Sequence, residues 1–451
     1  MEIFPNFLEK SKNQCYSEFM IEEAPKSPVT PDVLEILINE EYSRVVSKMN
    51  EEYLYWDKVK YQVPNGLKAE DFWNAVKYSR RLQTRTFKFS ACTFFLKETS
   101  TMQEALHNFD MNFGGPLAST NIISEKNRQY YLLSSIMEEA IASSQMEGAA
   151  TTRKVAKEML RKQAKPKDKS QQMILNNYNT IRYLSEHKND NLTPELLLEI
   201  HRQITEKTLD DSSDEGRFRT DDNIYVVDGI TGEVAHEPPS HTVIPETVKQ
   251  LCKFANTDGS FIHPIIKAII IHFMISYLHP FVDGNGRTAR SLFYWYMLKK
   301  GYWLTEYLSI SRVIYKSKSQ YEKAFLYTEH DDFDLGYFIQ YNLKVLKLAF
   351  EELQIYLERK SQENNALLEY RIPGLNERQI QIIKICVEKP TSIFTSKDLV
   401  TRFNVSVKTL RSDLEGLVTA GLMETVPINK RLTGYTRSKN FDSRLEEIRG
   451  K

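Results

Sequence analysis

The sequence predicts a mainly α-helical protein with a β-hairpin in its helical core and a small α+β domain at its C-terminal end. Strong helix formers fill long stretches such as residues 129–160. β-branched residues around an Asp-Gly pair predict one hairpin near residues 220–239. After residue 373, short helical patterns followed by a second hairpin pattern resemble a winged helix-turn-helix.

Length and composition limit the domain number, the compartment and the class of partner. A chain of 451 residues suggests roughly two to four domains. Sixty Lys and Arg balance sixty Asp and Glu, so any basic patch must be local. The cysteines are far apart and without metal-site spacing, which favours a reducing cytoplasm: Cys15, Cys92, Cys252 and Cys386. The apolar run 265–278 is shorter than the roughly 20 residues of a membrane helix, so we expect no membrane partner.

Turn signals divide the chain into four predicted segments. Residues 1–120 form an N-terminal helical region, and residues 121–350 form the helical core. Residues 351–372 are a helical linker, and Pro373-Gly374 mark the start of the C-terminal domain at 373–451.

Within the core, the elements follow from local signals. Only Gly148 interrupts the helical segment at 129–160. Asp228-Gly229 predicts the hairpin turn, and Pro238-Pro239 end the hairpin. An apolar helix from Pro264 to Leu278 then leads through a Gly-rich turn to a second helix at about 287–300.

The stretch from His279 to Arg290 joins those two helices and carries residue types that suit phosphoryl chemistry. Gly284-Asn285-Gly286 allows a tight turn at a helix N-terminus, which makes a nest for an anion. Arg287 and Arg290 share a helix face and can hold phosphate oxygens. Asp283 is placed to hold Mg²⁺, and His279 can take a proton from an attacking hydroxyl.

Each of these features is common on its own as an ordinary turn, helix end or surface ion pair. Their combination within twelve residues points to chemistry, and it resembles the signature of the Fic family, His-Pro-Phe-x-Asp/Glu-Gly-Asn-Gly-Arg-x-x-Arg, with every fixed position filled. The resemblance covers roughly residues 120–350. It implies His279 as general base, Asp283 as Mg²⁺ ligand, and Arg287 and Arg290 as phosphate ligands. It further implies Asn285, with the backbone of Gly284 and Gly286, as the anion hole.

The same resemblance indicates the reaction. The related Doc-like branch, which phosphorylates its target, has Lys where this chain has Gly286. A glycine there implies transfer of AMP from ATP to a Ser, Thr or Tyr hydroxyl of a protein, with pyrophosphate leaving. Such transfer depends on positioning and charge neutralisation.

The predicted hairpin resembles the flap of the Fic family, which pairs with an extended segment of the target. The flap residues are Ile224, Tyr225 and Val226. An ordinary surface hairpin is the alternative, but its position upstream of the motif favours a flap.

Ser143, Glu147 and Gly148 resemble the inhibitory motif Ser/Thr-x-x-x-Glu-Gly/Asn of the same family. Ser143 and Glu147 are four residues apart and share a helix face, and Gly148 ends or weakens the helix. By that resemblance Glu147 pairs with Arg290 and displaces the γ-phosphate of ATP.

The C-terminal domain has helices predicted at 396–403 and from Val407 to about Ala420, with a wing from Val426 to Tyr435. Lys408 and Arg411 face outward on the second of these helices. Because such domains also serve in protein docking, DNA, a protein and a second copy of the chain all stay open as partners.

The sequence therefore predicts an autoinhibited, cytoplasmic protein adenylyltransferase that uses ATP and Mg²⁺ and also modifies itself. Two alternatives stay open: removal of AMP from a modified protein at the same site, and a nucleotide-sensing regulator that binds DNA. Lys316 and Tyr321 are candidates for contact with adenine, with plain solvent exposure as the alternative explanation.

Overall fold

The computed structural model describes residues 21–26, 30–82, 84–113, 125–227, 232–257, 259–368, 374–403, 405–429 and 432–449. The chain forms two compact units, Met1–Leu353 and Gln354–Lys451. The division falls within helix α15, Gly336–Leu368. Helices dominate both units, and the described strands form three two-stranded sheets, so the prediction of a mainly α fold is confirmed.

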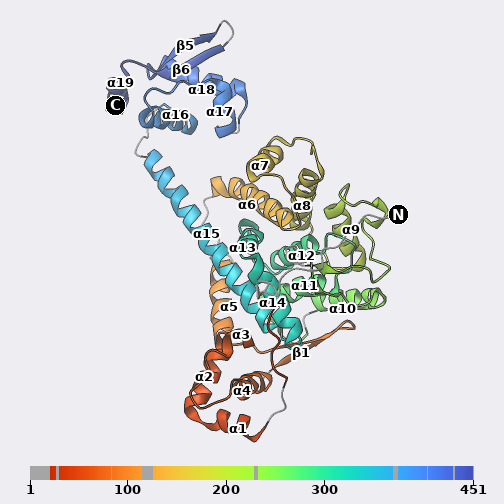
Figure 1. Cartoon of the computed structure of the whole chain (residues 1–451). Helices are drawn as coiled ribbons and strands as arrows, with labels where there is room; N and C mark the ends of the chain where they lie inside the picture. The colour runs from red at the N-terminus through yellow and green to blue at the C-terminus, as the bar shows by residue number, and fades with distance from the viewer. Residues whose placement is uncertain are drawn as a thin grey trace, which may run out of the picture. The chain divides into compact units, whose positions relative to one another are not determined.

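The N-terminal part of the first unit is a small group of helices around α4 (Figure 1). Its elements are α1 Pro31–Ile38, α2 Glu40–Glu51, α3 Trp56–Val59, α4 Ala69–Arg81, strands β1 Arg85–Lys88 and β2 Thr93–Leu96, and α5 Ser100–Phe113. Arg80 on α4 is fully buried and donates to the hydroxyl of Tyr337 at 2.6 Å, with Asp334 at 3.5 Å. These contacts tie α4 to the beginning of α15.

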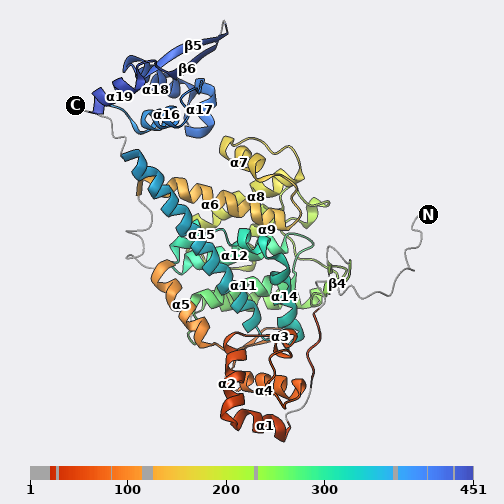
Figure 2. The ribbon, with the colours of Figure 1, turned by 60° about the vertical axis from the view of Figure 1, so that its left-hand side comes forward.

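The core of the first unit is built around the antiparallel pair α11, Pro264–Leu278, and α12, Asn285–Lys299 (Figures 1 and 2). Around this pair lie α6 Glu125–Met146, α7 Arg153–Lys162, α8 Lys169–Glu186, α9 Pro194–Thr205, α10 Ile244–Asn256, α13 Ile310–Lys316, α14 Lys318–His330, and the short 3₁₀ segments η1 Ser212–Asp214, η2 His241–Val243 and η3 Trp303–Tyr307. Helix α11 is apolar on all sides and almost wholly buried, as its sequence predicts.

Local chemistry fixes where the two central helices begin and end. Pro264 occupies the first turn of α11, where its missing N–H costs nothing. His279 ends α11 in the left-handed conformation, with φ 47°. Gly284, with φ 86°, precedes the first residue of α12. The chain therefore reverses direction within the six residues between the two helices.

The helical segment predicted at 129–160 is two helices. Helix α6 ends at Met146, Gly148 takes φ 90°, and α7 starts at Arg153 after Thr152 caps it by accepting from Val155 N–H. The interruption is therefore longer than the single glycine that the sequence predicts, because a capping residue is also needed to restart the helix.

The hairpin is present but shorter than predicted. Strand β3 is Val226–Val227 and β4 is Val234–His236, with Val226 opposite His236. Of the three predicted flap residues, Val226 lies in the strand, whereas Ile224 and Tyr225 precede it. The predicted turn at Asp228-Gly229 lies outside the described residues.

The second unit has its own apolar core. It contains α16 Glu377–Glu388, α17 Ser396–Phe403, α18 Val407–Thr419, strands β5 Met423–Asn429 and β6 Leu432–Arg437, and α19 Phe441–Arg449. Leu399, Leu410, Leu414 and Leu417 are buried in that core. The helices predicted at 396–403 and from Val407 are present, and β5 with β6 occupies the place of the predicted wing.

Pro373, at the predicted start of the C-terminal domain, and Cys15 lie outside the described residues. None of the described helices combines the length and the apolar character needed to cross a membrane.

Candidate functional site

His279 lies at the C-terminal end of α11, with its ring fixed by the helix it terminates. Its Nδ1 is 3.0 Å from the carbonyl oxygen of Ser276, and a carbonyl can only accept, so Nδ1 carries the proton. The other ring nitrogen, Nε2, is then the basic one. Burial lowers the pKa of His279 below its usual value, more than the Ser276 carbonyl and Glu147 raise it. His279 is therefore neutral near pH 7.

The turn after His279 is held by a side chain from within it. Asn285 is buried, accepts from the backbone N–H of Phe281 at 3.0 Å and donates to the carbonyl of Phe281 at 2.8 Å. Its amide thus bonds both polar groups of one residue and closes the turn. The role implied for Asn285 in an anion hole stays a prediction, and its side chain serves to shape the turn.

His201 on α9 supports the same turn from outside. Its Nε2 donates to the carbonyl of Asp283 at 2.8 Å, and its Nδ1 accepts from Gly216 N–H at 3.0 Å. Its ring stacks on Phe281, with ring centroids 3.7 Å apart. Burial lowers the pKa of His201 to about 4, so it stays neutral and keeps this tautomer.

Gly284 must be a glycine for two reasons. Its φ of 86° is strained for other residues, and a Cβ at that position would lie 2.8 Å from the methyl of Thr205 on α9. The turn therefore lies directly against α9.

Arg287 is fully buried on the first turn of α12. Its Nη1 donates to the carbonyl of Ile204 at 3.2 Å, and its Nη2 donates to the Asp283 carboxylate at 3.3 Å. Its Nε is a buried donor without a partner among the described residues. Asp283 is half exposed, with 49% of its side chain accessible. The carboxylate can therefore reach solvent while Arg287 holds it in place.

Arg290 is the residue on which the predicted inhibitory motif converges. Its Nη2 donates to the carboxylate of Glu147 at 2.9 Å and to the carbonyl of Ser143 at 3.0 Å, and its Nε donates to the hydroxyl of Ser143 at 2.9 Å. Ser143, Glu147 and Arg290 thus lie together as the sequence predicts. Burial raises the pKa of Glu147, but Arg290 and Arg287 outweigh it and hold that pKa below its usual value.

Glu147 also occupies the space in front of the glycine turn. A Cβ built on Gly286 would lie 2.3 Å from the Oε1 of Glu147 and 3.0 Å from Arg290 Nη1. The carboxylate therefore touches the N-terminal turn of α12, where an anion binds most readily.

Two residues that the motif does not contain, His236 and Arg219, bond the hairpin and the segment before it to α11 and to His279. His236 on β4 lies 2.7 Å from Glu329 Oε2 through Nδ1 and 2.8 Å from the carbonyl of Tyr277 through Nε2. Burial opposes its protonation, yet both partners only accept, and the pKa of His236 is raised. Arg219 is buried and donates from Nε to the carbonyl of His279 at 2.9 Å.

The described residues suit a Mg²⁺ ion that is bound together with a nucleotide. They contain no group of three or more His, Cys, Asp or Glu side chains that could hold a metal ion. Asp283 supplies a single half-exposed carboxylate. Mg²⁺ commonly uses one or two carboxylates together with substrate phosphates and water, so this donor set suits an ion that arrives with a nucleotide.

The two candidate adenine residues lie in different surroundings: Tyr321 is buried, whereas Lys316 is exposed. Tyr321 is buried and 2.9 Å from His272 Nε2, so solvent exposure does not explain it. Lys316 pairs with Glu352 at 2.5 Å on the surface. Contact of either residue with adenine stays a prediction.

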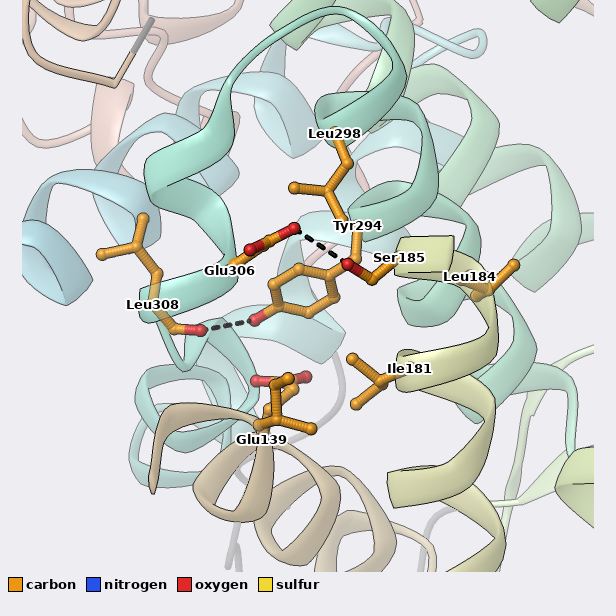
Figure 3. A pocket seen from close by; sticks show the side chains of 9 residues that line it. Glu139, Ile181, Leu184, Ser185, Tyr294, Leu298, Glu306 and Leu308 are labelled. Carbon is orange, nitrogen blue, oxygen red and sulfur yellow. Dashed lines mark hydrogen bonds between the residues drawn. The ribbon is translucent and has the colours of Figure 1, made fainter. Parts of the chain in front are cut away.

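An enclosed cavity beside α12 is not a substrate site. Figure 3 shows the Tyr294 ring between the hydrogen-bonded pair Ser185–Glu306 and the carboxylate of Glu139. The cavity has a volume of about 10 Å³, which holds no more than one water molecule. Glu139 is buried on α6 and accepts from the backbone N–H of Ser311 at 3.0 Å. It therefore binds α6 to the N-terminal turn of α13.

Comparisons with known proteins found similar sequences and structures. The model of the Fic/DOC family matches residues 191–297, which contain α9, the flap, α11 and most of α12. The chain is 33% identical over 117 residues to "Protein adenylyltransferase Fic" of Culex quinquefasciatus, which is 26% of this chain and 21% of that protein. It is 33% identical over 116 residues to "Protein adenylyltransferase fic-1" of Caenorhabditis elegans, again 26% of this chain and 21% of that protein.

The chain thus spans about a fifth of the length of these curated relatives. Among solved structures, a Fic family protein from Desulfovibrio desulfuricans G20 is similar at a TM-score of 0.49 and 18% identity, over 76% of this chain and 97% of that one.

Proposed function

We propose that this chain, whose residues 191–297 match the Fic/DOC family, transfers AMP from ATP to a protein hydroxyl. We further propose that Glu147 holds it inactive. The arrangement of His279 carries the first of these proposals. A neutral histidine whose Nδ1 is protonated and bound to Ser276 has its Nε2 available to accept a proton.

In the proposed reaction, Nε2 of His279 takes the proton of the target hydroxyl. The hydroxyl oxygen forms a bond to the α-phosphorus of ATP, and the bond between that phosphorus and the bridging oxygen to the β-phosphate breaks. Pyrophosphate leaves with the electron pair, and the target retains AMP as a phosphodiester. No covalent intermediate on the enzyme is needed.

Residues of the turn and of α12 serve the phosphate groups. The N-terminal turn of α12 favours an anion, although the Gly284 N–H already donates to the Asp283 carboxylate, and Arg287 and Arg290 add two buried positive charges. Asp283 is the residue that would hold Mg²⁺, which neutralises the charge of the phosphates when it is bound.

A cleft beside the flap offers room for a target segment, and its lining does not include His279 itself. It has a volume of about 660 Å³ and is lined by Ala235 and His236 of β4 and by Tyr277 of α11. An extended segment that pairs with a flap strand is recognised by its backbone more than by its sequence.

The position of the Glu147 carboxylate supports autoinhibition. It binds Arg290 through a charge-assisted hydrogen bond and touches the N-terminal turn of α12. A phosphate that binds Arg290 must first replace this carboxylate. This autoinhibitory contact, called the brake below, is thus a competition between the Glu147 carboxylate and a phosphate for Arg290.

The test uses α-labelled ATP with Mg²⁺ and a cell lysate, with label followed on the chain itself and on other proteins. We expect Glu147→Gly to raise labelling by about tenfold or more, since loss of a competing interaction of about 1.4 kcal/mol gives a factor of ten. Glu147→Gly/His279→Ala should return labelling to background. Glu158→Gly, which removes an exposed carboxylate of α7, is the matched control. Absence of label with Glu147→Gly would contradict the proposal.

Removal of AMP from a modified protein is the second candidate, because the Glu147 carboxylate lies where it could also orient a water molecule. The two reactions differ in their dependence on Glu147. Wild-type chain that releases AMP from a labelled target, while Glu147→Gly does not, would favour removal over transfer.

A further inference from the structure

Arg219 is buried between the base of the flap and the backbone of the catalytic turn. Only 1% of its side chain is exposed, although arginine is rarely buried without several partners. Its hydrogen bonds divide into two groups that go to separate segments of the chain. One group goes to the end of α11, and the other goes to both stems of the flap.

The first group holds the backbone of His279. The backbone N–H of Arg219 donates to the carbonyl of Pro280 at 2.9 Å, and its Nε donates to the carbonyl of His279 at 2.9 Å. His279 has a left-handed backbone, which is unfavourable for a residue with a side chain. At a helix end such carbonyls have lost their partners within the helix, so Arg219 supplies what the helix cannot. Its positive charge also suits the helix C-terminus.

The second group closes the base of the flap. On the incoming stem, Nη1 donates to the carbonyl of Asp221 at 2.7 Å and to the carboxylate of Asp222 at 2.8 Å. On the outgoing stem, Nη2 donates to the carbonyl of Pro239. The Asp222 carboxylate also accepts from the hydroxyl of Ser240 at 2.9 Å. One guanidinium thus joins both stems.

The described strands of the flap pair over a short distance only, with Val226 opposite His236 and Val227 opposite Val234. Two strands of this length do not fix their own position. The position of the flap relative to the base is therefore set by its anchors. Arg219 and His236, which is bound to the carbonyl of Tyr277, are two such anchors.

We propose that Arg219 is a positioning residue that fixes the flap and the left-handed backbone of His279 to each other, so that a target hydroxyl carried by the flap arrives at the base. This inference rests on the proposed transfer reaction. In this role Arg219 does not contact ATP, so binding of the nucleotide and alignment of the target depend on different residues.

The experiment compares variants in the Glu147→Gly background, so that activity of the parent tests the transfer reaction by itself. Arg219→Gln removes the charge and the fork of donors. Arg219→Lys keeps the charge but not the planar fork, which spans the two segments. Arg217→Gln is the matched control, because Arg217 lies two residues away, is half exposed and pairs with Asp214. ATP binding is measured by calorimetry, transfer by labelling, and flap mobility by amide hydrogen exchange.

We expect Arg219→Gln to bind ATP within about threefold of the parent while its transfer rate falls by about tenfold or more. Arg219→Lys should recover part of that loss. Amides of residues 220–227 and 232–240 should exchange faster in Arg219→Gln, with α8 unchanged, and Arg217→Gln should match the parent throughout.

Three results would overturn the proposal while the parent stays active. Transfer by Arg219→Gln could equal that of the parent. Loss of ATP binding together with faster exchange throughout the first unit would make Arg219 a general folding residue. An equal loss in Arg217→Gln would assign the effect to charge alone. If the Glu147→Gly parent is inactive, the transfer reaction is refuted. In that case, unchanged amide hydrogen exchange of the flap in Arg219→Gln would refute the anchoring role as well.

Discussion

His279 combines the roles of helix terminator and candidate base in one residue. Its left-handed backbone costs about 1–2 kcal/mol for a residue other than glycine. The hydrogen bond from the ring to the Ser276 carbonyl and the one from Arg219 to the His279 carbonyl offset part of that cost. Strain of this kind persists where the surroundings hold it, which is typical of functional sites.

The lowered pKa of His279 predicts the pH dependence of the reaction. A base works only when it is neutral, so activity falls as the pH drops through its pKa. Burial lowers that pKa below about 6.5, the cations His236 and Arg219 lower it further, and Glu147 raises it. In Glu147→Gly the last effect is lost. The acid limb of kcat/KM for that variant should therefore be centred below about pH 6.5.

Rates of AMP transfer between pH 4.5 and 8, normalised to enzyme shown to be folded at each pH, measure this limb. A limb centred clearly above pH 6.5 would mean that the ring is solvated or paired with a carboxylate during turnover. His279 would then not be the neutral base described above.

The motif residues could be predicted from sequence because they lie within twelve consecutive positions. His201, Arg219 and His236 could not, because their partners are backbone carbonyls of distant segments, such as Asp283, His279 and Tyr277. Every residue has a carbonyl, so no pattern of side chains marks such an acceptor. Only the fold shows which carbonyls lack a partner and which cation reaches them.

At the scale of elements, α6 presents one face to the site. Glu139, Ser143 and Glu147 are spaced by four residues, the spacing of one helical turn. Ser143 and Glu147 bind Arg290, and Glu139 accepts from Ser311 at the start of α13. Burial raises the pKa of Glu139, although Ser311 and Tyr294 lower it. The inhibitory pair was predictable from its motif, but Glu139 was not.

Glu139→Gln should loosen the hold of α13 on α6 and so weaken the brake. The amide replaces one acceptor oxygen by a donor that faces other donors, at a cost of about 1–3 kcal/mol. Basal labelling should rise, and the melting temperature of the first unit should fall. Labelling in parallel with thermal melts checks both.

Glu138→Gln is the matched control, because Glu138 is the neighbouring carboxylate and binds Arg153 of α7 instead of α13. Equal labelling by Glu138→Gln and Glu139→Gln would show that any loosening of α6 suffices. Unchanged labelling by Glu139→Gln would show that Ser143 and Glu147 hold the brake alone.

At the scale of the whole molecule, the two units have separate cores. The second unit has an apolar core of its own, which includes Leu414 of α18 at 0% exposure. Its helices could be predicted because helical patterns are local in the sequence, whereas the binding of DNA or of a second copy of the chain stays a prediction. The division after Leu353 falls inside α15, where the sequence predicts a helical linker at 351–372, and the four predicted segments stay a prediction.

Leu414→Ala should therefore destabilise the second unit alone. Loss of a buried leucine side chain costs about 2–5 kcal/mol. In calorimetry, the transition that ATP does not stabilise should move to lower temperature, while labelling by the first unit in the Glu147→Gly background stays unchanged. Val407→Ala on the same helix, where the side chain is 40% exposed, is the control. A single transition that moves as a whole would contradict separate unfolding.

In the proposed mechanism Glu147 and a phosphate compete for Arg290, so the form in which Glu147 binds Arg290 is closed to the nucleotide. The apparent dissociation constant of ATP then equals the intrinsic one divided by the fraction of molecules that are open. A chain built in this way responds to the ATP concentration of its surroundings through the position of one carboxylate. Its dose response is shifted as a whole along the concentration axis, and the size of the shift is set by the closing equilibrium of α6.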